Sequence, residues 1–132
     1  MTNFKWTSAN EMGHPEIDDQ HKQLFLLGEA VLESLTHLDE KNIAVAQINA
    51  FIAFAQEHFK YEEGLMRSAG YPGLDQHAKF HASLLADLRV HCDKVQWDPN
   101  IDPVDLTNYL CDWLKLHIDL EERDLVAWLR SH

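Results

Sequence analysis

Residues 48–66 read INAFIAFAQEHFKYEEGLM. Apolar side chains recur in this stretch at intervals of three and four residues, which is the period of an amphipathic helix. His58 and Glu62 fall on the same stripe, and residues four apart lie one above the other on a helix face. The stretch therefore predicts a long helix whose buried face is first apolar and then carries two side chains that can bind a metal.

Three more stripes with the helical period lie at residues 21–38, 77–95 and 106–129. Polar or turn-forming segments at residues 39–42, 70–73 and 98–103 separate the four stripes. Such helices most simply pack as an all-α, antiparallel up-down-up-down four-helix bundle. Gly13 and Pro15 punctuate an N-terminal segment without a sustained period. We therefore expect a single domain over residues 1–132, with an extended N-terminal arm at 1–17 and the bundle at 18–129.

The composition argues against several classes of partner. The chain has 132 residues, with 11 Lys and Arg against 22 Asp and Glu and a formal net charge of −11. Such a charge repels phosphate backbones and anionic lipids, so we expect no nucleic-acid partner and no membrane insertion. The absence of a signal-peptide pattern and of an apolar run near roughly 20 residues favours a cytoplasmic location. Cys92 and Cys111 form no metal or redox motif and are expected to be buried, inert thiols.

Every stripe carries side chains that can bind a metal. They are His21 on the first, His58 and Glu62 on the second, His77 and His81 on the third, and His117 with Glu121 and Glu122 on the fourth. In an alternating bundle, the starts of the first and third helices lie at the same end as the ends of the second and fourth. All four contributions therefore converge at one end. A buried ionised carboxylate is very costly without a partner, so we expect a cation there.

The number and type of these ligands favour a pair of metal ions. A structural zinc site normally takes four ligands, often with thiolate, whereas this set offers five imidazoles and bridging carboxylates without cysteine. Calcium and magnesium would call for fewer imidazoles. Two iron ions bridged by carboxylates fit best, and pairs of copper, manganese or zinc ions stay open as alternatives. His14, His37 and His91 lie off the pattern and are expected to be solvated or to cap helices.

Four segments give the chain a resemblance to a known family. They read IDDQH at 17–21, HFKYE at 58–62, HAKFH at 77–81 and WLKLHI at 113–118. An isolated HxxxH is weak evidence, but the ordered set of these four segments at these separations is specific. The chain resembles the bacterial hemerythrins, which are non-haem di-iron bundles that bind oxygen, and the resemblance runs from Trp6 to about Leu129.

The resemblance implies a division of the ligands between two oxo- or hydroxo-bridged iron ions. One iron would be held by His77, His81 and His117, the other by His21 and His58, and Glu62 would bridge them. The family's second bridging carboxylate is normally an aspartate five residues after the last histidine, where this chain has Glu122. Glu121, one helical turn after His117, is the competing candidate.

The function implied by the resemblance is reversible dioxygen binding for oxygen transport, storage or buffering. The iron with two histidines keeps an open position for O2, and Phe25, Trp113, Leu114 and Ile118 are candidates for the apolar lining of its pocket. We expect no enzyme, a monomeric state and, as a further partner, an oxygen-consuming recipient. The alternatives are a di-iron peroxidase, in which Tyr61 or Tyr109 could relay electrons, and an oxygen- or iron-sensing module.

Overall fold

The protein is described by a computed structural model that covers residues 11–36, 41–98, 100–116 and 123–131. The helices in these ranges are α1 (Pro15–Ser34), α2 (Lys41–Ala69), α3 (Leu74–Trp97), α4 (Pro103–Leu116) and α5 (Arg123–Ser131). No β-strand occurs in the described ranges. The all-α prediction is confirmed.

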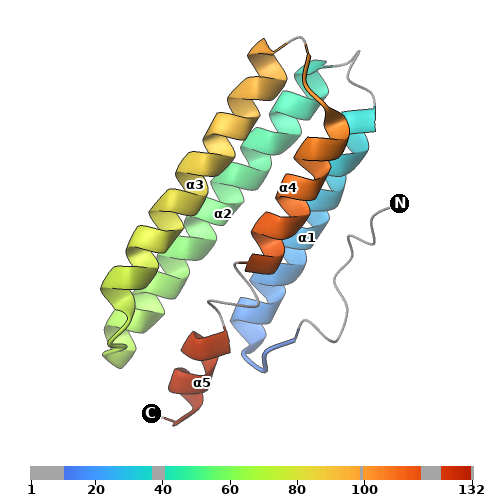
Figure 1. The fold of residues 1–132 in the computed structure, drawn as a ribbon. Helices are drawn as coiled ribbons and strands as arrows, with labels where there is room; N and C mark the ends of the chain where they lie inside the picture. Colours follow the sequence, from blue (N-terminus) through green and yellow to red (C-terminus); the bar gives the residue numbers. More distant parts are fainter. Residues whose placement is uncertain (1–10, 37–40, 99, 117–122, 132) are drawn as a thin grey trace.

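The first four helices lie side by side and alternate in direction (Figure 1). α2 packs against both α1 and α3, and α4 returns alongside α1. This is the antiparallel up-down-up-down arrangement that the stripes predicted. Because α2 and α3 are joined by a short turn at one end, the end of α2 and the start of α3 are neighbours.

The first helix begins earlier than the stripe predicted. α1 starts at Pro15, and the Nδ1 atom of His14 caps it by accepting a hydrogen bond from the Ile17 backbone N–H at 3.2 Å. Proline suits the first position of a helix because its missing N–H would have no partner there. The arm boundary at residue 17 is therefore wrong: residues 15–17 are helical, and Ile17 is fully buried.

Residues just before α1 fold back onto its first turn. The Asp18 carboxylate accepts hydrogen bonds from the backbone N–H groups of Met12 at 2.9 Å and Gly13 at 3.2 Å. Gly13 has a φ of +86°, and a Cβ at this position would overlap the Arg130 guanidinium of α5. The described end of the arm thus lies against the first turn of α1 and against α5. Residues 1–10 lie outside the described residues.

A tight turn sets α2 beside α3. Gly70 adopts a φ of +69°, and the Tyr71 backbone N–H donates a hydrogen bond to the Met66 carbonyl at 2.8 Å. A left-handed glycine followed by such a bond is the usual way to end a helix. The turn brings the last third of α2 against the first turns of α3.

The described part of the fourth stripe is helical. It consists of α4 up to Leu116 and α5 from Arg123. Residues 117–122 lie outside the described residues, and in Figure 1 α5 is set below α4. Leu125 and Val126 of α5 are buried, so the apolar stripe does predict the inner face of this segment.

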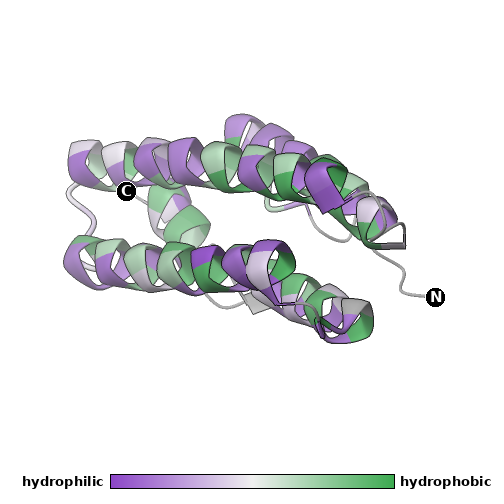
Figure 2. Ribbon diagram, turned by 90° about the horizontal axis from the view of Figure 1, so that it is seen from above, coloured by the Kyte–Doolittle hydropathy of each residue, from purple (hydrophilic) through white to green (hydrophobic). Residues whose placement is uncertain are grey.

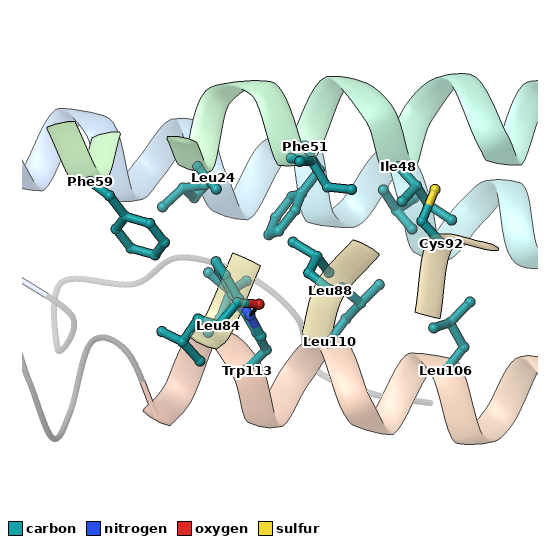
Figure 3. Packing of buried hydrophobic residues seen from close by; sticks show 14 of the residues in the cluster. Leu24, Ile48, Phe51, Phe59, Leu84, Leu88, Cys92, Leu106, Leu110 and Trp113 are labelled. Carbon is teal, nitrogen blue, oxygen red and sulfur yellow. Dashed lines mark hydrogen bonds between the residues drawn. The ribbon is translucent and has the colours of Figure 1, made fainter. Parts of the chain in front are cut away.

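The inner faces of the helices form a continuous apolar core. Figure 2 shows hydrophobic and hydrophilic residues on every helix, as amphipathic elements require. Figure 3 shows the core running between the helices from Phe59 to Leu106, with Phe51 and Trp113 near its middle. The rings of these two residues meet edge to face at 5.4 Å, and the indole N–H of Trp113 donates a hydrogen bond to the Leu84 carbonyl at 3.1 Å. None of the helices in the described ranges contains an apolar stretch long enough to cross a membrane.

Candidate metal centre

A buried cluster of ionisable side chains lies between α1 and α2. The Nε2 atom of His58 is 3.0 Å from Oε2 of Glu62, and the Nε2 atom of His21 is 3.9 Å from the same oxygen. One ligand atom from each of the three residues lies within 4.8 Å of the other two. All three side chains are withdrawn from solvent. The helical spacing of four residues places His58 above Glu62 on α2, and the antiparallel packing of α1 adds His21.

The second oxygen of Glu62 faces the next helix. Its Oε1 atom lies 3.5 Å from Nε2 of His81, which is 1% exposed on α3. One carboxylate oxygen is therefore turned toward the histidines of α1 and α2, and the other toward a histidine of α3. This arrangement is what a carboxylate that bridges two metal ions requires.

His77 lies on the same face of α3 as His81, one turn earlier. It is 8% exposed, and its ring is nearly perpendicular to that of His81 with the centroids 5.9 Å apart. Tyr71, from the turn between α2 and α3, meets the His77 ring edge to face at 5.4 Å. The structure therefore brings this predicted ligand to the same end of the bundle.

Hydrogen bonds on the outer nitrogens orient two of these rings. The Nδ1 atom of His58 lies 2.7 Å from Oε1 of Gln20, whose amide group also donates to Glu16 at 3.0 Å. The Nδ1 atom of His81 lies 3.0 Å from Oε2 of Glu63. An ionised carboxylate only accepts hydrogen bonds, so His81 donates from Nδ1 and its Nε2 lone pair is turned toward Glu62. Such outer partners fix the tautomer and the orientation of metal-binding histidines.

The donor set fits a metal ion. Imidazole nitrogens and carboxylate oxygens that approach each other with their lone pairs repel unless a cation lies between them. Metal–nitrogen and metal–oxygen bonds of about 2.0–2.2 Å place two neighbouring ligand atoms about 3 Å apart or more. The separations of 3.0–3.9 Å around Glu62 agree with this geometry. The buried negative charge of Glu62 would also be compensated there.

Four of the predicted site residues lie outside the part of the chain that the structure describes. His117, Ile118, Glu121 and Glu122 all fall in residues 117–122. The choice between the two glutamates as second bridge therefore stays a prediction.

The predicted pocket residues that are described lie in or against the core. Trp113 is 3% exposed and Leu114 is 1% exposed, while Phe25 is half-buried and packs against the core. Sequence reasoning missed Phe59, whose ring stacks on His81 with centroids 4.0 Å apart and an interplanar angle of 7°. The Trp113 ring lies next to Phe59, with the ring centroids 5.9 Å apart. An apolar wall thus covers the α3 side of the cluster.

Gln20 and Glu63 were also missed. Each is the direct sequence neighbour of a predicted ligand, and Gln20 also lies within the segment IDDQH that carries the family resemblance. Gln20 follows the pattern of a surface position on α1, yet it bonds to a histidine of α2. Only the packing of the two helices reveals this role.

A groove of about 390 Å³ reaches the outer edge of the cluster between α1 and α2. It is lined mostly by acidic and amide side chains, namely Glu16, Asp19, Gln20, Gln23, Phe54, Glu57 and His58. His58 therefore borders both the buried cluster and this polar groove.

The cysteines differ from each other in burial. Cys92 is buried as predicted, whereas Cys111 is only half-buried, so that expectation is wrong for the second thiol. Burial raises the pKa of both thiols, and the neighbouring charges of Asp93 and Asp112 add to the effect. Both thiols therefore stay protonated and poorly nucleophilic near neutral pH, as predicted.

His91 is neither simply solvated nor a helix cap. Its ring stacks on Tyr109 with centroids 3.6 Å apart, and its Nδ1 atom lies 2.9 Å from the Asp87 carbonyl.

Comparisons with known proteins agree with this geometry. The family model described as "Hemerythrin HHE cation binding domain" matches residues 12–129. A hemerythrin of Sipunculus nudus is 32% identical over 117 residues, which are 87% of this chain and 84% of the relative. Bacteriohemerythrin of Clostridium acetobutylicum is 24% identical over 93% of this chain and 98% of its own, and that of Ralstonia nicotianae is 28% identical over 98% and 90%. With its helical bundle, its buried histidine and glutamate cluster and a family match over nearly its whole length, the chain belongs to the hemerythrin family as a metal-binding domain.

Proposed function

We propose that this protein binds dioxygen reversibly at a carboxylate-bridged pair of iron ions. The observation that carries the proposal is the divided orientation of Glu62. Its Oε2 atom is turned toward His21 and His58, and its Oε1 atom toward His81. A carboxylate that served a single ion would not need histidines on both sides.

The proposed ligands form two unequal groups. His21 and His58 would hold one iron, while His77, His81 and His117 would hold the other, with Glu62 and Glu122 as bridges. The resemblance to the hemerythrins supports this division, as do the described contacts of Glu62. The group with two histidines leaves room for O2, and it lies on the side where α1 and α2 meet.

When bound, such a metal pair supplies the electrons that dioxygen binding requires. The protein's own side chains hold the pair and tune it. Gln20 and Glu63 fix the rings of His58 and His81 through their Nδ1 atoms. Phe59 stacks on His81 and Trp113 lies next to Phe59, so apolar rings line the α3 side of the pair.

The position of Tyr109 favours a carrier role over enzymatic turnover. This candidate electron relay stacks on His91, away from the cluster. Transport, storage and buffering of oxygen all follow from reversible binding.

The proposal is tested by reconstitution with ferrous iron under anaerobic conditions, followed by cycles of O2 addition and removal. We expect a visible absorption change on adding O2 that disappears under argon over repeated cycles. The His58→Ala variant should lose this response. His91→Gln, which changes a histidine outside the cluster, should keep it. An irreversible change in the first cycle, or none, would contradict reversible binding.

A further inference from the structure

The outer face of α3 carries a strip of exposed side chains that the metal centre does not use. Val90 is 52% exposed and Trp97 is 74% exposed, and residues seven apart lie nearly in line on a helix. The small exposed residues Ser83 and Ala86 continue this line toward the helix start. We call these four residues the α3 strip. It faces away from Leu88 and Cys92, which are buried on the core side of the same helix.

Two opposite charges flank the α3 strip at the same height. Asp93 and Lys94 are consecutive, so they point about 100° apart and lie on either side of the line from Val90 to Trp97. Neither side chain forms a hydrogen bond or ion pair with any residue in the described ranges. With Val90, Trp97 and Asp98 they line a shallow hollow of about 530 Å³.

We propose that the α3 strip binds a second copy of this chain, in a two-fold contact whose axis runs parallel to α3. In that arrangement each Val90 and each Trp97 meets its counterpart, and Asp93 faces Lys94 of the partner subunit on both sides. The face is self-complementary: its apolar residues meet the same residues of the other copy, and its two charges meet opposite charges, as an isologous contact requires. The chain's charge of −11 opposes association elsewhere on its surface, whereas Asp93 and Lys94 cancel here.

The charge pattern also selects the orientation. A two-fold axis perpendicular to α3 would set the helices antiparallel and place Asp93 beside its own counterpart and Lys94 beside its own. Like charges in contact oppose association. Only the parallel arrangement pairs Asp93 with Lys94 of the partner subunit.

The contact is small, so the dimer is weak. It involves about four turns of one helix, less than the roughly 1,200–2,000 Å² of a stable interface, and we expect a Kd on the order of 100 µM. The protein is then a monomer when dilute, as the sequence predicts, and associates when concentrated. The strip lies on the exposed face of α3, while His77 and His81 lie on the buried face, so dimerisation leaves the metal centre unchanged.

Sedimentation equilibrium of the full chain from about 10 µM to 1 mM, a range that brackets the expected Kd, tests the proposal. The average mass should rise toward that of a dimer, and Trp97→Ala should weaken association at least ~10-fold because large aromatic residues dominate small interfaces. Leu26→Ala removes another exposed apolar side chain, 59% exposed on α1, and should leave association unchanged. A wild-type chain that stays monomeric throughout, or a Trp97→Ala chain that associates as well as wild type, would overturn the proposal.

A charge exchange tests the orientation. Asp93→Lys alone changes the net charge from −11 to −9, because it replaces one negative by one positive charge, and should ease association if only net charge mattered. The parallel contact predicts weaker association instead, since two lysines would then face each other. Lys94→Asp alone should also weaken it. The double variant Asp93→Lys with Lys94→Asp keeps −11 and should restore the dimer, whereas failure to restore it in a folded protein would overturn the parallel contact.

Discussion

The two ends of the bundle are built on the same helices but have opposite chemistry. We call the region around His21, His58, Glu62 and His81 the metal end, and the region around Ile48, Phe51, Leu88 and Leu110 the apolar end. Along α2 the stripe passes from one to the other without a change in burial: Phe51 is 0% exposed and Glu62 is also 0% exposed. Position on the stripe decides burial, and side-chain type decides whether burial stabilises the fold or creates a site.

Burial has opposite effects on the stability of the fold at the two ends. At the apolar end, buried side chains stabilise the folded state by roughly 1.5–3 kcal/mol each. At the metal end, burial of a carboxylate opposes folding until a cation compensates it. We therefore expect the apolar end to hold the metal-free protein together and the metal end to gain its stability from the bound ions.

The largest effect on stability should come from the apolar end. Phe51→Ala removes a fully buried ring that contacts Trp113, and should lower the free energy of unfolding of the metal-free protein by about 3–5 kcal/mol. Urea denaturation measures this. Ile43→Ala, at a 50% exposed position of the same helix, should change it by less than about 1 kcal/mol. Equal losses in both variants would mean that the apolar end is not a packed core.

At the metal end, a substitution by an apolar residue should instead stabilise the metal-free protein. Glu62→Leu removes the cost of burying a carboxylate, and should raise the free energy of unfolding of the metal-free protein by about 1–3 kcal/mol. The same variant should fail to retain iron. Glu57→Leu, on the exposed face of α2, should keep the iron and serves as the control. Thermal unfolding with iron analysis checks both, and a Glu62→Leu protein that is less stable without metal would argue for a protein-only ion pair.

A smaller effect, on iron affinity, is expected for a residue that forms a hydrogen bond with a ligand. Gln20→Leu removes the hydrogen bond to Nδ1 of His58, and should weaken ferrous binding about 10–100-fold, as is typical for outer partners of metal-binding histidines. Anaerobic titration monitors the affinity. Gln23→Leu changes a residue that lines the same groove and should bind iron like wild type. If the two variants behave alike, the contact between Gln20 and His58 does not orient the ligand.

The smallest effect concerns an ionisable group toward the apolar end. Burial, with a contribution from the charge of Asp87, raises the pKa of Tyr109 to about 12. Because this pKa is above the ordinary value of 10.0, the unfolded chain loses the proton first, and the contribution to stability is lost as pH rises from about 10 to 12. Ultraviolet titration should show a tyrosine that ionises near pH 12 and is missing in Tyr109→Phe. An unchanged titration curve in the variant would contradict the assignment.

The fold was predictable because its signals are local. The period of the stripes gave the helices and the antiparallel bundle, and the spacing of His58 and Glu62 gave a ligand pair on one face. The start of α1 was missed by a few residues because the stripe was counted from His21, although Pro15 is a standard first residue of a helix.

The details of the site needed the tertiary structure. Sequence spacing cannot tell that the two oxygens of Glu62 face different helices, because this depends on how α1 and α3 pack against α2. The partnership of Gln20 with His58 joins residues 38 positions apart. Phe59 follows His58 directly, yet its stacking on His81 arises only from the packing of α2 against α3.

The central claim is that the metal end holds a bridged pair of iron ions. The most direct measurement is the number of ferrous ions retained per chain after anaerobic reconstitution and desalting, in wild type and in Glu62→Leu. We expect two ions in the wild type and a loss of tightly bound iron in the variant. One ion per wild-type chain, or two ions that persist without Glu62, would contradict the bridged pair.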